Sequence, residues 1–137
     1  MALSDSQDNC VITYGESEAQ IDLAGTVKKG DCVGFSGGWK RALATAGSVV
    51  NMLCVAAEDG ESGQRITAYF GNVILAGTRL SGGTAGASLY VAEGTSAGKY
   101  TETAPDTSTD MNTIIGEMLT ATTAILYPHK NVQSIVA

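Results

Sequence analysis

Apolar residues occur along this chain in short runs of about six, and each run ends in a cluster of Gly, Asp and Ser. The clearest run is Val50–Ala57. It is followed by an acidic, Gly-rich break at residues 58–64 and then by a second run, Arg65–Phe70. Runs of this length that are rich in β-branched and aromatic residues favour strands, and the glycines between them favour a turn. The pattern therefore predicts a β-hairpin.

A similar unit returns later in the chain. Asn112–Leu119 and Thr123–Tyr127 repeat the apolar run, the break and the aromatic-ended run. The stretches upstream also match in outline: Gly30–Phe35 and Trp39–Ala42 precede the first copy, and Gly86–Val91 and Lys99–Glu102 precede the second. Two copies are too few for a repeat array. We therefore predict one all-β domain with little helix, a compact β-barrel or sandwich-like fold built from two degenerate modules of four strands each.

The run Val50–Ala57 has two apolar faces. The two-residue period places Leu53, Val55 and Ala57 on one side and Met52, Cys54 and Ala56 on the other. This is typical of a strand that is buried on both sides. Residues 42–50 could begin a helix, but Gly47 and the pair Val49-Val50 favour a loop that leads into the strand.

The first nine residues, Met1–Asn9, are polar and give little to bury, so the sequence predicts a mobile arm. A short strand, Cys10–Tyr14, follows, and residues 15–20 form a polar break. One interpretation is a frayed terminus followed by an edge strand. The other is an arm that adds a strand to the sheet edge of a partner, with Cys10, Val11, Ile12, Thr13 and Tyr14 as the contact residues. We divide the chain into an arm with the first strands (1–26) and a β-rich domain (27–137).

Charge and hydropathy exclude some classes of function. The chain has 137 residues and a formal net charge of −6. An acidic protein with only two pairs of adjacent basic residues, Lys28-Lys29 and Lys40-Arg41, is not suited to binding a nucleic-acid backbone. No apolar run approaches the roughly 20 residues that a membrane-spanning helix needs, and the polar N-terminus does not resemble a signal peptide. We therefore expect neither nucleic acid nor membrane as a partner.

Residue types that carry chemistry are few. The three cysteines, Cys10, Cys32 and Cys54, form no CxxC pair, and we expect Cys32 and Cys54 to be buried in a protein made in a reducing cytosol. His129 is the single histidine, so neither a metal site nor a Ser-His-Asp arrangement is predicted. The acidic break at residues 58–61 lacks the alternate spacing of a calcium loop and is interpreted as a solvated turn. We expect no enzyme activity and no cofactor.

Aromatic residues offer two interpretations. Trp39 is expected to be a core or subunit-interface anchor, and Tyr69 and Tyr90 are further candidates for a subunit interface. Alternatively, Trp39, Tyr69, Tyr90 and Tyr100 could form a stacking surface in a small-ligand or carbohydrate-binding module. The apolar C-terminal residues, Ser134–Ala137, are expected to dock on the body or on a neighbour.

Several of these stretches resemble the capsid decoration, or cement, proteins of tailed phages. In that family a G-D-x-V strand, a pIGvAlED-like strand and a later copy of both recur. Here the corresponding stretches are Lys29–Phe35, Val50–Ala57 with Glu58-Asp59, and Gly86–Leu119. Asn112–Leu119 is the stretch that resembles the family pattern most clearly. The resemblance covers residues 27–127. The chain departs from it by carrying Met52-Leu53-Cys54 where the pattern has Pro-Ile-Gly.

The resemblance implies a structural virion protein that is made in the host cytoplasm and binds the outer surface of a phage head. Its partners would be the major capsid protein and two further copies of itself in a homotrimer that clamps adjacent capsid subunits. In relatives an N-terminal arm can order against the capsid, which implies that residues 1–14 are the contact element. Deleting Met1–Asn9 is then expected to leave a folded body and to weaken capsid binding.

Overall fold

The computed structural model describes residues 3–128 and 133–137. These residues contain strands, turns and loops and no helix, which confirms the predicted all-β fold class. The strands, in chain order, are β1 (Ser4–Asp5), β2 (Cys10–Gly15), β3 (Glu18–Asp22), β4 (Cys32–Phe35), β5 (Trp39–Arg41), β6 (Cys54–Ala56), β7 (Arg65–Tyr69), β8 (Val73–Gly77), β9 (Leu80–Ser81), β10 (Ser88–Val91), β11 (Tyr100–Thr101), β12 (Gly116–Met118) and β13 (Ala124–Leu126).

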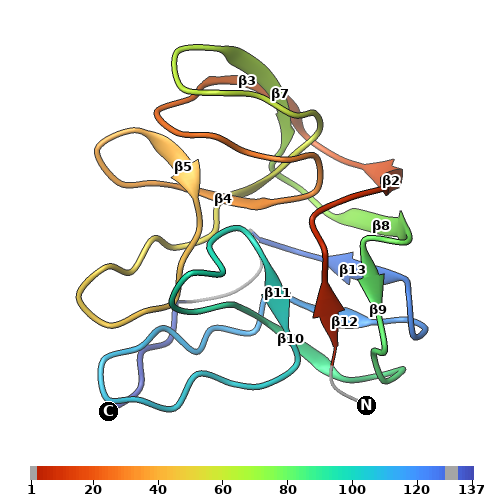
Figure 1. The fold of residues 1–137 in the computed structure, drawn as a ribbon, viewed down its shortest axis with the longest axis vertical. Coiled ribbons are helices and arrows are strands. Elements are labelled where there is room, and N and C mark those ends of the chain that lie inside the picture. The colour runs from red at the N-terminus through yellow and green to blue at the C-terminus, as the bar shows by residue number, and fades with distance from the viewer. Residues whose placement is uncertain (1–2, 129–132) are drawn as a thin grey trace.

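The strands form two main sheets. One sheet has five strands in the order β3-β7-β6-β4-β5, and the other has six in the order β11-β10-β12-β13-β8-β2. β1 and β9 form a separate pair. Every strand pair is antiparallel. In Figure 1 strands of the five-stranded sheet occupy the upper half of the molecule, and β8 to β13 occupy the lower half.

The topology confirms the two modules and enlarges them. The order β3-β7-β6-β4-β5 is repeated as β8-β13-β12-β10-β11, so each module has five strands rather than four. The registers also correspond: Cys32 pairs with Val55 in the first copy, and Ser88 pairs with Glu117 in the second. The added strand precedes each predicted unit. β3 is largely polar, whereas β8 is an apolar strand.

The central strands are shorter than the apolar runs. β6 covers only Cys54–Ala56 of the predicted run, and all three of its residues are buried. Cys54 and Ala56 face the smaller core and Val55 faces the larger one, as the alternation predicts. Met52 lies in the larger core with Val55, not with Cys54. The prediction is wrong at this residue because the regular strand begins only at Cys54.

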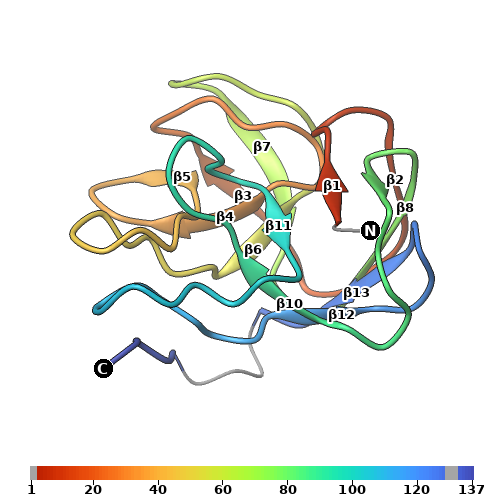
Figure 2. The same ribbon diagram turned by 60° about the horizontal axis from the view of Figure 1, so that its bottom comes forward.

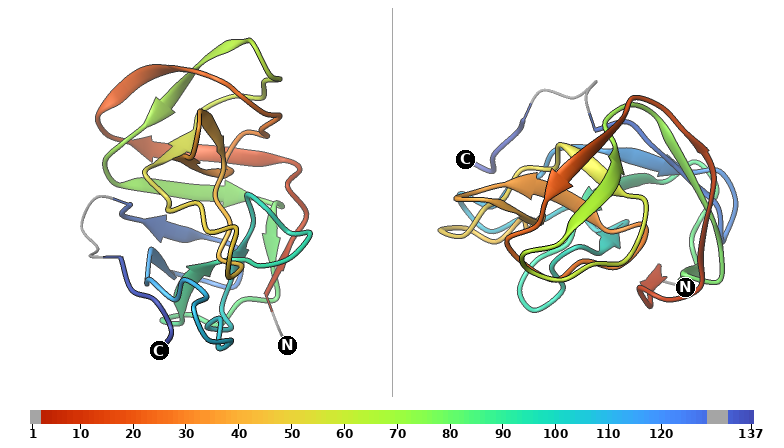
Figure 3. Two further views of the ribbon diagram at one scale, coloured as in Figure 1. Left: turned by 90° about the vertical axis from the view of Figure 1, so that its left-hand side faces the viewer. Right: turned by 90° about the horizontal axis from the view of Figure 1, so that it is seen from above.

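A long antiparallel ribbon connects the two sheets. β2 continues into β3 and β7 continues into β8, and the two segments run side by side with a bend near Glu16 and Asn72 (Figure 3). At the bend the backbone N–H of Glu16 donates to the carbonyl of Asn72 at 3.1 Å. The predicted polar break at residues 15–20 is therefore too long, since β3 already begins at Glu18.

Two clusters of buried side chains form the core. The larger cluster lies between the sheets and takes Cys32 and Val55 from one sheet and Leu75 and Leu126 from the other. The smaller cluster, which includes Leu23, lies inside the five-stranded sheet. That sheet is closed on itself by a parallel bridge from Leu23 to Trp39.

The N-terminal segment is not a mobile arm. β1 pairs with β9, with Ser4 opposite Ser81 and Asp5 opposite Leu80, and the Asp5 side chain is buried. The prediction of a segment with little to bury is wrong because it considered only apolar burial. The C-terminal residues do dock on the body, as expected: the N–H of Asn112 donates to the carbonyl of Ser134 at 2.9 Å.

Candidate interaction surface

The predicted contact residues form the outer strand of the six-stranded sheet. β2 has β8 as its neighbour on one side and no strand on the other among the described residues. Val11 is 49% exposed and Tyr14 is 47% exposed, and Thr13 is exposed as well. A bulge lies between Ile12 and Tyr14. The strand therefore presents an unpaired backbone edge with apolar side chains beside it.

β2 is also uncharged, which separates it from the corresponding edge of the other sheet. Its sequence is CVITYG, whereas the edge strand β3 is EAQID. In β3 the carboxylate of Asp22 accepts a hydrogen bond from Arg65 Nε at 2.8 Å. Charged residues on an edge strand prevent pairing with other chains, and β2 lacks this protection. Of the two edges, β2 is the one suited to strand addition.

Trp39 belongs to an aromatic cluster with Phe35 and Phe70. The ring centroids of Phe35 and Trp39 are 5.3 Å apart and those of Trp39 and Phe70 are 5.6 Å apart, and both pairs meet edge to face. Phe35 is opposite Trp39 in the β4–β5 hairpin and is 58% exposed. Trp39 therefore packs its ring against the smaller core while Phe35 extends the apolar surface into solvent.

The tyrosines do not join this cluster. Tyr69 packs against the larger core, where its ring covers Gly15, and Tyr90 is half-buried opposite Thr101. Tyr100 is buried, and its hydroxyl donates to the carbonyl of Gly30 at 2.7 Å. Tyr100 therefore cannot contribute to the predicted stacking surface, because its ring has no face in solvent.

A buried ion network lies beneath the N-terminal segment, and the sequence reasoning missed it. Arg79 is fully buried and donates through Nε to Asp5 Oδ1 at 2.9 Å and through Nη2 to Asp5 Oδ2 at 3.0 Å. Its Nη2 atom also lies 2.8 Å from Asp31 Oδ1. Arg41 Nε donates to the other Asp31 oxygen at 2.7 Å. Two guanidinium groups and two carboxylates thus balance one another.

The network satisfies the remaining donors of Arg79 with backbone oxygens. Nη1 donates to the carbonyl of Lys29 at 2.8 Å and Nη2 to that of Gly98 at 3.0 Å, and the Tyr100 ring lies 5.5 Å from the guanidinium carbon. Burial by itself lowers the pKa of Arg79, but Tyr100, Asp5 and Asp31 raise it above its ordinary value. The side chain therefore stays charged although it is buried.

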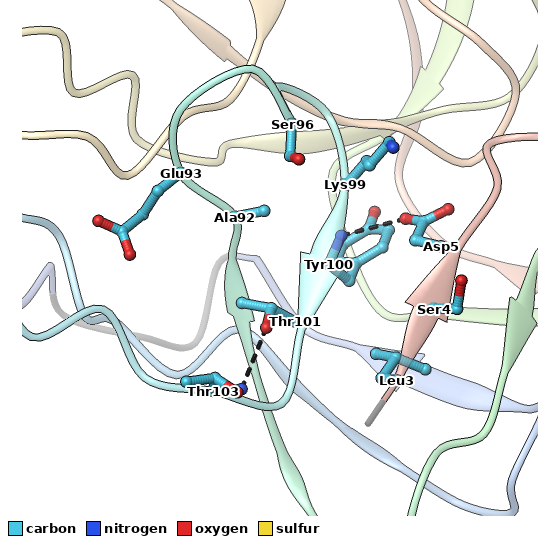
Figure 4. Close-up of a pocket in the computed structure, with 10 residues that line it drawn as sticks. All are labelled: Leu3, Ser4, Asp5, Ala92, Glu93, Ser96, Lys99, Tyr100, Thr101 and Thr103. Carbon is cyan, nitrogen blue, oxygen red and sulfur yellow. Dashed lines mark hydrogen bonds between the residues drawn. The ribbon is translucent and has the colours of Figure 1, made fainter. Parts of the chain in front are cut away.

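A cavity of about 350 Å³ lies between β1 and β11 (Figure 4). Its lining is largely polar and includes Lys99, Glu93 and Thr103. Figure 4 shows Asp5 on β1 next to Tyr100 on β11, whose backbone N–H donates to Asp5 Oδ2 at 3.1 Å. We call the space between β9 and β11 the seam. β1 lies in the seam: it pairs with β9 on one side, and the cavity lies between it and β11 on the other.

The other chemical candidates have structural roles. Cys32 and Cys54 are buried as predicted, and burial raises the pKa of the Cys54 thiol to about 12. In the acidic turn, Asp59 accepts a hydrogen bond from the Lys29 N–H at 2.7 Å. His129 lies outside the described residues. Within the described ranges, no group of three or more His, Cys, Asp or Glu side chains could hold a metal ion, and no helix is long and apolar enough to cross a membrane.

The geometry thus contains an uncharged edge strand, an aromatic cluster in which Phe35 is exposed, and a buried network that fixes the N-terminal segment. Comparison with known proteins adds no further assignment: no protein-family model, no curated protein and no solved structure matches this chain.

Proposed function

We propose that this protein is a structural component of a tailed-phage head. It binds the outer surface of the capsid as a homotrimer and stabilises the head by clamping adjacent major capsid subunits. The resemblance of residues 27–127 to capsid decoration proteins indicates the major capsid protein as the partner. The free edge of β2 supplies a surface with which the chain can bind it.

The observation that carries the proposal is the contrast between the edge strands β2 and β3. β3 carries carboxylates along its edge, whereas the exposed side chains of β2, Val11, Thr13 and Tyr14, are uncharged. Strand addition obtains affinity from main-chain hydrogen bonds and selectivity from alternate side chains. In a trimer the contact is repeated by symmetry, so that a weak single contact becomes firm attachment through avidity.

The aromatic cluster of Phe35, Trp39 and Phe70 supplies the subunit contact in this proposal. Phe35 is a large apolar side chain that is more than half exposed, and aromatic residues are enriched at protein interfaces. Trp39 takes part through the cluster. Tyr69 and Tyr90 are half-buried within the chain, so they contribute less accessible surface than Phe35.

Capsid binding is tested by co-sedimentation of the purified protein with expanded heads of tailed phages that lack their decoration protein. Val11→Lys places a charge on the free edge at a position that is already exposed, so the fold should tolerate it. The matched control is Ala19→Lys, which places the same charge on the exposed edge of β3. We expect the Val11 variant to lower the bound fraction at least tenfold and the control to leave it unchanged. Equal binding by both variants would contradict the assignment of β2 as the contact strand.

The alternative function is a small-ligand or carbohydrate-binding module. The exposed ring of Phe35 next to Trp39 is the observation that favours it, because aromatic rings on a β surface can stack on sugar rings. A glycan array separates the two functions. Specific glycan binding that Phe35→Ala abolishes, together with a monomer in light scattering, would support the alternative.

A further inference from the structure

The two modules close their sheets in different ways. In the first module the segment after β3 reaches β5 directly: the N–H of Ala24 donates to the carbonyl of Trp39 at 2.8 Å, and Leu23 forms a bridge with Trp39. In the second module the corresponding elements, β9 and β11, do not pair with each other. β1 lies between them, as Figure 2 shows for β1 and β11. The N-terminal segment is therefore the piece that completes the second module.

Asp5 is the side chain that links β1 to β11. β1 pairs with β9 over two residues, and it meets β11 through the Asp5 carboxylate instead of a backbone ladder. The residues beside it add contacts of their own, since Leu3 packs against the larger core and Gln7 Nε2 donates to Asp31 Oδ1 at 2.9 Å. The Asp5 carboxylate makes both contacts to Arg79 Nε and Nη2. Because Arg79 is fully buried and its other donors are already used, the seam is complementary to a short extended segment with one carboxylate.

The connection from β1 to β2 is short and strained. It contains residues 6–9, of which Gln7 has a φ of 59° and Asn9 a φ of 53°. Left-handed backbone is unfavourable for residues other than glycine, although Asn tolerates it better than most. Short connections under strain favour the exchange of an element between identical chains, because the exchanged form keeps the contacts and releases the strain.

We propose that the seam accepts the N-terminal segment of a second copy of this chain, with Asp5 of one copy bound to Arg79 of the next. This inference rests on the self-assembly that is part of the proposed function. An extended four-residue connection spans about 13 Å, so the donor copy has to pack directly against the acceptor. Each copy would thereby complete the second module of its neighbour.

Disulfide trapping in the full-length protein tests the exchange. Ser4 and Ser81 are exposed register partners, and the Cα separation of such a pair lies in the range that a disulfide bridges. We would introduce Ser4→Cys and Ser81→Cys together with Cys10→Ala, which removes the half-buried native thiol, and oxidise the protein at assembly concentrations. Exchange gives disulfide-linked dimers or trimers on a non-reducing gel. Monomers that carry an internal disulfide, or no disulfide at all, would overturn the inference.

The mass of the unmodified protein, measured by light scattering, distinguishes failure of the exchange from failure of the proposed self-assembly. A trimer whose chains are linked only internally refutes the exchange and leaves the proposed function intact. A protein that is monomeric at every concentration refutes the exchange and the self-assembly together, and only capsid binding would then remain to support the function.

A matched pair of variants at Asn9 tests whether strain in the connection drives the exchange. Its side chain is exposed, and the contact to Thr78 uses its backbone carbonyl, which any residue provides. In the disulfide-trapping background, Asn9→Gly relieves the left-handed conformation and Asn9→Ala increases its cost. We expect the interchain fraction to be several-fold higher in the Ala variant than in the Gly variant. Equal fractions would overturn the role of the connection in driving exchange.

Discussion

Truncation of Asp5 to Ala should strongly destabilise the fold, although the residue lies in a polar segment five residues from the start of the sequence. The substitution removes both contacts to Arg79 Nε and Nη2 and leaves the N–H of Tyr100 without its carboxylate acceptor. Removing one partner of a buried ion pair typically costs about 3–5 kcal/mol. Arg79 keeps Asp31 and two carbonyl oxygens, so we expect the lower end of that range, about 3 kcal/mol.

The molecule supplies its own control. Arg65 and Asp22 form an exposed Arg–Asp pair with an Nε–Oδ1 distance of 2.8 Å, and their side chains are 65% and 71% exposed. Solvent screens the attraction between exposed charges, so Asp22→Ala should be nearly neutral. The two variants thus compare the same chemistry at two depths of burial.

Urea unfolding followed by circular dichroism measures both free energies. With a slope of about 1.5 kcal/mol per M, a loss of 3 kcal/mol moves the midpoint by about 2 M. The Asp22 variant should leave the midpoint close to that of the unmodified protein. If the two midpoints fell together, the claim that β1 is fixed by a buried ion network would be refuted.

Three further predictions concern thiols, pH and packing. In the native protein neither Cys32 nor Cys54 should react with a thiol reagent at pH 8, because burial raises the pKa of both thiols, that of Cys54 to about 12. Both thiols should react once urea unfolds the protein. Reaction of either thiol in the native state would contradict their burial. A hydrogen bond between the carboxyl groups of Glu93 and Asp110 raises the pKa of Glu93 and lowers that of Asp110 from their ordinary values. The contribution of this pair to stability is present when Glu93 is protonated and Asp110 ionised, so it should fall as the pH rises through the Glu93 pKa and as it drops through the Asp110 pKa. Glu93→Gln should remove the loss at rising pH, and an unchanged pH profile of unfolding would contradict the hydrogen bond between the two carboxyl groups. Gly34→Ala should cost about 1–3 kcal/mol, because the added Cβ overlaps the backbone oxygen of Asn51, whereas at Gly25 the nearest atom is 3.7 Å away and the same substitution should be far milder in urea unfolding.

The apolar pattern predicted four strands of each module because these four pair with strands that are near them in the sequence. Cys32 pairs with Val55, and Val55 with Tyr69, across breaks that the sequence marks with glycines and acids. The pattern failed where pairing is distant. β3 is polar and mostly exposed, and its pairing with β7 is visible only once the ribbon between the sheets is known.

Arg79 was missed for a related reason. It is a lone cation in a stretch of small residues, and such residues are usually exposed. Its burial depends on Asp5, which lies 74 residues earlier, and on Asp31, so no window of the sequence contains the set. A single Arg two residues after the apolar strand β8, with no charged neighbour in the sequence, is the one local signal that could have indicated a buried ion pair.

The buried network changes how the role of the N-terminal residues should be tested. From the sequence, deleting Met1–Asn9 was expected to leave a folded body, so that lost capsid binding would identify the arm as the contact. In the structure the deletion removes Asp5 and leaves the buried Arg79 without half of its anionic partners. Loss of binding would then report unfolding of the second module as readily as loss of a contact. A substitution on the exposed side of β2, such as Val11→Lys, alters the proposed contact and leaves the network in place, so it separates binding from stability where the deletion cannot.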